Sequence, residues 1–234
     1  RKDWGEIVGS ENCLNLNIWA PKPNPTEIEN QNIVYPVMVW IHGGSNTAGS
    51  ADLYNPTELV YRHNLVVVTI NYRLGPFGWF RHPSLIHQLD NKKDQSGNYG
   101  NLDTIAALKW VKNNIANFGG DTNNITIFGE SAGGYNVAAL LSSTLAEGLF
   151  HKAVVQSGGI KPGDITHSED FLSEPLPWKN YSSKELFNEL LIAKGMAVNK
   201  KEATSIQVKM PSKKVVSILR SATTKEIFQA YLEA

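Results

Sequence analysis

The 234-residue chain has a single cysteine, no excess of either charge, and no apolar run long enough to cross a bilayer. Cys13 cannot form an internal disulfide, so cysteine usage leaves the redox compartment open. Twenty-two basic residues balance 22 acidic residues, whereas binding to nucleic acid or acidic lipid favours a basic surface. No signal-like segment opens the chain. The 41% share of hydrophobic residues is ordinary for a soluble globular protein.

Both ends of the chain look like interior points of a longer protein. The first residue is Arg1 rather than methionine. A capping box from Thr223 to Glu226 opens a helix whose apolar stripe still continues at Ala234. We therefore expect a segment truncated at both ends. Such a segment leaves the location of the protein open, and a secreted or periplasmic protein is one possibility.

A glycine-rich motif at 129–134 separates a strand-like apolar run at 125–128 from a helix-like run at 135–141. Its serine, Ser131, has glycine two residues away on either side, which is the G-x-S-x-G nucleophile elbow of α/β-hydrolases. Glycine is needed there because a Cβ would collide with the adjoining strand or helix, and the serine is held in strained backbone geometry. A chance glycine-rich turn is the alternative interpretation.

A second glycine motif, His42-Gly43-Gly44-Ser45, follows a buried strand predicted at 36–41. Ligands of open α/β sheets bind at the carboxyl ends of the strands. The motif predicts an oxyanion hole in which the backbone N–H groups of Gly44 and Ser45 act together with that of Ala132. A plain turn is the alternative, and the downstream elbow favours the oxyanion hole.

Strand and helix patterns alternate along the first 159 residues, which predicts parallel strands joined by right-handed crossovers. We expect Arg73 to tie loops together through carbonyls or a carboxylate rather than to contact substrate. The polar stretch 82–100 is predicted to be a solvated loop, and residues 160–234 an incomplete helical insertion or cap of the same domain. The expected elements are strands at 13–19, 36–41, 65–71, 125–128 and 153–155, and helices at 103–118 and, after the elbow, 135–143, with further helices near 185–194, 200–209, 212–220 and from 223 onward.

Six stretches occur in an order that resembles one known family: 10–18, 36–44, 71–75, 98–103, 118–121 and 129–133. Together they resemble the type-B carboxylesterases, the cholinesterase-like group of the α/β-hydrolase fold, and look nearest to its bacterial members. The resemblance covers residues 5–159 well and the helical tail loosely. Asn12 stands where the family usually has aspartate, and Asn15 where it has an aromatic residue.

The resemblance implies hydrolysis of small-molecule carboxylic esters by a serine, acid and histidine triad, without metal or organic cofactor. Ser131 takes the nucleophile position, and Gly44, Ser45 and Ala132 take the oxyanion positions. Ser45 replaces the usual third glycine, so its side chain would narrow the acyl pocket. Glu130 takes a supporting position beside the nucleophile. The family often pairs the cysteine at position 13 with an earlier one, which here would precede Arg1.

The other two triad members have no convincing candidates in this chain. In this fold the order is serine, acid, histidine, and only His151 and His167 follow Ser131. His151 precedes a predicted core strand, and His167 lies in a loop without the expected order of acids. The resemblance puts the acid and the histidine beyond residue 234. We therefore expect this segment alone to show little turnover.

Two other classes of protein are considered. A non-catalytic, esterase-like binding or adhesion module would typically have lost the nucleophile, whereas Ser131 stands in an intact motif. A nucleotide-binding domain is disfavoured because the glycines at 129, 133 and 134 do not follow G-x-G-x-x-G. An ester hydrolase that forms an acyl-serine intermediate is the favoured interpretation.

Overall fold

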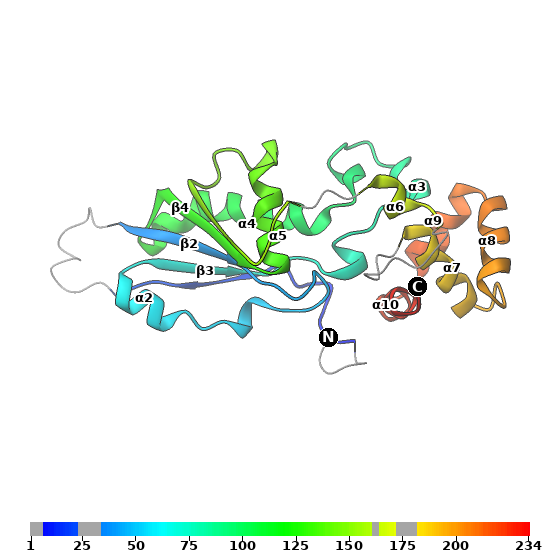
Figure 1. The fold of residues 1–234 in the computed structure, drawn as a ribbon, viewed down its shortest axis with the longest axis horizontal. Helices are drawn as coiled ribbons and strands as arrows, with labels where there is room; N and C mark the ends of the chain where they lie inside the picture. Colours follow the sequence, from blue (N-terminus) through cyan, green and yellow to red (C-terminus); the bar gives the residue numbers. More distant parts are fainter. Residues whose placement is uncertain (1–6, 23–33, 161–163, 172–181) are drawn as a thin grey trace. The chain divides into compact units, whose positions relative to one another are not determined.

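The computed structural model describes residues 7–22, 34–160, 164–171 and 182–234. The chain divides into two compact units (Figure 1). The sheet unit comprises residues 12–74 and 100–161 with residue 1, and the helical unit comprises residues 75–99 and 162–234 with residues 2–11. The interpretation of 160–234 as a cap of the same domain stays a prediction.

The described part of the sheet unit contains a five-stranded sheet in the order β1-β3-β2-β4-β5. β1 pairs with β3 antiparallel, and the other neighbouring strands are parallel. The predicted α/β architecture with a mostly parallel sheet is confirmed. The strands are β1 Leu16–Trp19, β2 Tyr35–Ile41, β3 Val66–Ile70, β4 Gly120–Glu130 and β5 Lys152–Gln156.

The central strands explain where the site forms. Every residue of β3 is buried, as expected for an apolar strand covered on both faces of a parallel sheet. β2 and β4 run parallel with Ile41 opposite Gly129. The two strands therefore end at the same edge of the sheet and deliver both glycine motifs there.

Helices flank the sheet, and α5 packs against β4 and β5. The helix expected from residue 103 begins earlier, at Tyr99, and its last turn is the 3-10 helix η4, which ends at Gly119 with φ 78°. Glycine takes this left-handed backbone conformation without a Cβ penalty. The helical segments of the sheet unit are η1 Ala51–Leu53, α2 Thr57–His63, α4 Tyr99–Asn114, η4 Ile115–Phe118, α5 Ala132–Leu141 and η5 Thr144–Ala146.

The helical unit has a separate apolar core in which Phe187 and Leu190 are fully buried. The side chains of Ser182 and Thr223 cap the helices that follow them, and the capping box of Thr223 with Glu226 is confirmed. The helices and 3-10 turns of this unit are η2 Gly75–Phe77, α3 Pro83–Ile86, η3 Asp94–Ser96, α6 Ile165–Glu169, α7 Ser183–Ala193, α8 Lys200–Lys209, α9 Ser212–Ser221 and α10 Thr224–Glu233.

The prediction of a solvated loop over 82–100 is wrong for its first part. His82 is 3% exposed, and its Nε2 lies 3.4 Å from Oε1 of Gln207 in α8. Arg81, immediately before this stretch, forms an ion pair with Glu169 at 2.5 Å. These polar residues pair inside the unit with partners about 90 to 125 positions away, so local polarity gave the wrong indication.

Candidate active site

Ser131 occupies the junction between β4 and α5 and has φ 54° and ψ −121°. A serine rarely adopts this backbone conformation, and holding it requires support from its surroundings. Ser131 N donates to the carbonyl of Gln156 at 3.0 Å, and Ser131 O accepts from Tyr135 N at 3.0 Å. The strained geometry predicted for this serine is confirmed.

The glycines on either side leave no space for a side chain. A Cβ on Gly133 would lie 2.0 Å from the carbonyl oxygen of Ile41 in β2. A Cβ on Gly129 would lie 2.6 Å from Gly133 and 2.7 Å from the same Ile41 oxygen. The sharp bend therefore depends on close packing between the backbones of β4, α5 and β2.

The second glycine motif packs directly against the elbow. A Cβ on Gly43 would lie 3.4 Å from Cβ of Ser131, 2.8 Å from the Glu130 carbonyl and 3.2 Å from Glu130 Oε2. The loop then turns through three consecutive residues with positive φ: Gly44 at 106°, Ser45 at 55° and Asn46 at 57°. The Gly44 carbonyl accepts the N–H groups of Thr47 and Ala48, each at 3.0 Å.

Three backbone N–H groups are available near this bend. Within the described residues, the N–H groups of Gly44, Ser45 and Ala132 donate to no protein acceptor. Ala132 is the first residue of α5, where the helix leaves N–H groups unsatisfied and the dipole favours negative charge. The structure thus brings together the predicted nucleophile and the loop and helix end that carry the predicted donors.

The base of the glycine loop is buried against an aromatic side chain. His42 is fully buried, and its ring stacks on Tyr72 at a centroid distance of 4.4 Å. The Tyr72 hydroxyl donates to the His42 carbonyl at 2.5 Å. Burial lowers the pKa of His42 and raises that of Tyr72, so both side chains are held neutral as structural supports.

His151 lies too far along the sheet to act on Ser131. Its Nδ1 accepts from Ile125 N at 3.1 Å, in the middle of β4 and six residues before Ser131. Six residues of strand from 125 to 131 span about 20 Å. His167 is exposed in α6 of the helical unit. In the described part of the chain, no side chain hydrogen-bonds to the Ser131 hydroxyl, and no group of His, Cys, Asp and Glu residues could hold a metal ion.

Arg73 has the structural role predicted for it. Its Nε and Nη2 each donate to the Asp103 carboxylate at 2.7 Å, and its backbone N–H donates to Asp103 Oδ2 at 3.0 Å. Asp103 is 7% exposed and belongs to α4. This bidentate pair ties the segment after β3 to α4.

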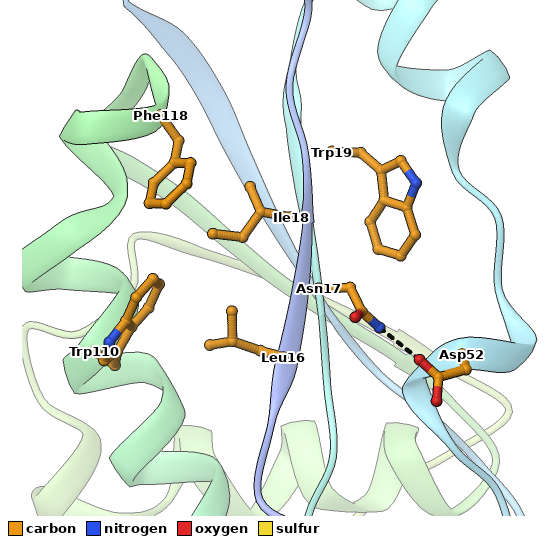
Figure 2. Close-up of a pocket in the computed structure, with 7 residues that line it drawn as sticks. All are labelled: Leu16, Asn17, Ile18, Trp19, Asp52, Trp110 and Phe118. Atoms are coloured by element: carbon orange, nitrogen blue, oxygen red, sulfur yellow. Dashed lines mark hydrogen bonds between the residues drawn. The ribbon is translucent and has the colours of Figure 1, made fainter.

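A surface pocket of about 690 Å³ lies on the sheet unit (Figure 2). Figure 2 shows alternate residues of β1 pointing to opposite sides of the strand, and all four are partly exposed. Asn17 donates to Asp52 at 3.0 Å. None of the predicted site residues lines this pocket; its lining is Leu16, Asn17, Ile18, Trp19, Asp52, Trp110 and Phe118.

The sequence analysis missed two asparagines next to the site. Asn46 follows Ser45 in the glycine loop, and Asn136 lies in α5 with only 4% exposure. Asn136 Nδ2 donates to Asn46 Oδ1 at 2.9 Å. A single polar amide inside the apolar helix run 135–141 was the signal that could have pointed to this contact.

None of the helices in the described ranges combines the length and the apolar character needed to cross a membrane.

Comparison with known proteins gives a consistent result. The chain is 46% identical to human cocaine esterase over 165 residues, and 48% identical to para-nitrobenzyl esterase of Bacillus subtilis over 151 residues. These alignments cover 70% and 64% of this chain but only 27% and 28% of the two relatives. The chain therefore spans about a quarter of the length of these relatives.

Solved structures agree with the sequence relatives. A para-nitrobenzyl esterase matches with a TM-score of 0.67 and 35% identity, covering 95% of this chain and 39% of that one. A carboxylesterase of Geobacillus stearothermophilus matches with a TM-score of 0.68 and 33% identity, covering 96% and 39%. Both are esterases, and the model of the carboxylesterase family matches residues 1–233. With the elbow and the glycine loop in place, the chain belongs to the carboxylesterase family.

Proposed function

We propose that the protein hydrolyses carboxylic esters with Ser131 as the nucleophile. One observation carries this proposal: a serine with φ 54° and ψ −121° stands at a strand-to-helix bend, packed against the backbone of Gly43. Strained backbone of this kind persists where the surrounding structure enforces it, and it clusters at active sites. The bend presents a hydroxyl beside unsatisfied backbone donors, as acyl transfer requires.

The N–H groups of Gly44, Ser45 and Ala132 would bind the oxygen of the tetrahedral intermediate. Removing one such donor typically lowers kcat by about 10² to 10³. The N-terminus of α5 adds positive potential where the negative charge develops. Glu130 would support the loop electrostatically, because its carboxylate lies beside Gly43. The Ser45 side chain would narrow the acyl side of the pocket.

In the proposed reaction the Ser131 oxygen attacks the ester carbonyl carbon, and its proton passes to a base. The base returns that proton to the departing alcohol, which leaves an acyl-serine, and water then releases the acid. His151 is too distant to be this base. We expect the acid and the histidine from sequence outside these 234 residues, so residues 1–234 alone should turn over little ester.

Small-molecule esters are the proposed substrates, since the matched relatives are named as a cocaine esterase and a para-nitrobenzyl esterase. No metal or organic cofactor enters the proposed chemistry.

The proposal is tested on the longest protein that carries this chain. The protein is incubated with a fluorophosphonate probe and digested with a protease, and the masses of its peptides are measured by mass spectrometry. We expect covalent mass on the peptide that contains Ser131, and none in Ser131→Ala. Ser142→Ala is the matched control, because Ser142 is exposed just beyond the other end of α5, about 15 Å away.

The competing class is a non-catalytic binding module built on the same fold. A folded wild-type protein that neither reacts with the probe nor hydrolyses a 4-nitrophenyl ester would reject the hydrolase and favour that module.

A further inference from the structure

The glycine loop, which begins at His42 and includes Gly44, Ser45 and Asn46, is held in a backbone conformation that Ser45 and Asn46 disfavour. Ser45 and Asn46 both have positive φ, at 55° and 57°. For residues other than glycine this region is strained, although asparagine tolerates it better than most. The hydrogen bonds from Thr47 and Ala48 to Gly44 close the turn from within, but they do not attach it to the nucleophile helix.

Asn46 and Asn136 make that attachment. Asn136 Nδ2 donates to Asn46 Oδ1 at 2.9 Å, and Asn46 Nδ2 approaches Asn136 Oδ1 at 3.5 Å. The two residues are 90 positions apart. Asn136 belongs to α5, whose first residue, Ala132, carries one proposed donor. Asn46 directly follows Ser45, which carries another.

Asn136 is also linked to the base of the same loop. Its side-chain amide lowers the pKa of Tyr72, against the larger effect of burial, and the Tyr72 hydroxyl donates to the His42 carbonyl at 2.5 Å. The amide of Asn136 therefore contacts the loop at Asn46 directly and at His42 through Tyr72. Asparagine is a poor helix former, and a buried amide is tolerated when its hydrogen bonds are made.

We infer that the Asn46–Asn136 pair is a positioning device that holds the N–H groups of Gly44 and Ser45 in register with Ser131 and Ala132. The inference rests on the proposed ester hydrolysis. Neither asparagine touches the reacting atoms in this role. Each acts through the backbone of the loop, so losing the pair should weaken transition-state binding and leave substrate binding nearly unchanged.

The test uses Asn46→Gly, Asn136→Leu and the double variant in the longest protein that carries this chain. Glycine accepts the positive φ of position 46 and removes the side chain, and leucine fills a similar volume without hydrogen bonds. Rates are expressed per fluorophosphonate-titrated site, so an unfolded fraction does not lower them. Asn188→Leu is the matched control: Asn188 is also a buried helix amide, bonded to Thr204 and Gln207 in the helical unit.

We expect each single variant to lower kcat per site about 10- to 100-fold, with KM changed less than about twofold. The double variant should be no slower than the worse single variant, because the pair acts as a unit. The inhibition constant of a trifluoromethyl ketone, which forms an oxyanion on Ser131, should rise by the factor by which kcat/KM falls. Asn188→Leu should leave the rate per site unchanged.

Rates per site within twofold of wild type in both single variants would overturn the inference while leaving the proposed function intact. If Asn136→Leu fails to fold, the loop variant Asn46→Gly decides by the same criterion. A wild-type protein that is inert to both probe and ester instead rejects the proposed function, and with it the positioning role.

Discussion

In the sheet unit, the backbones of β2, β4 and α5 pack closely against one another around the elbow. In the helical unit, buried side chains make the contacts that join the helices. A Cβ on Gly133 would come within 2.0 Å of a carbonyl oxygen, whereas a Cβ on Gly195, just after α7, would meet nothing within 4 Å. Gly195 has φ +67° and serves the turn that ends the helix. Gly133 therefore provides space for a close approach of two backbones, whereas Gly195 provides a backbone conformation.

The two units also differ in what their buried side-chain amides connect. Asn136 connects one helix to a strained loop beside Ser131. In the helical unit, Gln207 Nε2 donates to Asn188 at 2.8 Å, and Asn188 donates to Thr204 at 2.9 Å, so these amides join α7 and α8. The same chemistry positions a reactive segment in one unit and fixes helix packing in the other.

The largest effect is expected from Gly133→Ala, which tests the backbone packing of the sheet unit. The added methyl would overlap the Ile41 carbonyl, so β2 or α5 must move. We expect a cost above the ~3 kcal/mol typical of overpacking, with loss of soluble folded protein and of probe labelling. Gly159→Ala is the control, since a Cβ there meets nothing within 4 Å. A Gly133→Ala protein that melts like wild type would contradict the comparison.

Phe187→Ala tests the side-chain packing of the helical unit. Phe187 is fully buried in α7, and truncating such a residue costs about 3–5 kcal/mol. Hydrogen exchange should accelerate in peptides from 183–193 and not in those from 125–141. Val198→Ala is the control at an 82% exposed position, where we expect a change within about 0.5 kcal/mol. Equal acceleration in both regions would show that the units do not differ as described.

The sheet and the elbow could be predicted because their signals are local. A continuous apolar run marks β3, and the spacing of Gly129, Ser131 and Gly133 marks a bend that few other residues permit. The predicted strand ends were less accurate. β4 begins at Gly120, which pairs with Tyr35, rather than at residue 125. The residues at 121–124 are polar, so no apolar periodicity indicates this earlier start.

The misses come from contacts between residues distant in the sequence. His82 looked like part of a solvated loop because its burial depends on Gln207, 125 residues later. The Asn46–Asn136 contact spans 90 residues between a loop and a helix. Neither of these two contacts can be recognised from a sequence pattern. Prediction relies on the periodic spacing of apolar residues, and in both contacts the buried residues are polar.

The smallest of the three effects is a pH dependence confined to the helical unit. Burial lowers the pKa of His82 to about 4, against a weaker opposing effect of its hydrogen bond to Gln207. Below the ordinary histidine value near 6.5 the unfolded chain takes up a proton that the folded chain refuses. The contribution of His82 to the free energy of unfolding is therefore fully present above about pH 6.5 and falls by about 3 kcal/mol as the pH drops to about 4.

Urea unfolding measures this pH dependence. In His82→Gln the free energy of unfolding should vary less with pH across this range, whereas His87→Gln, at an exposed position, should follow the parent protein. A His82→Gln profile as steep as that of the parent would assign the acid sensitivity to other groups.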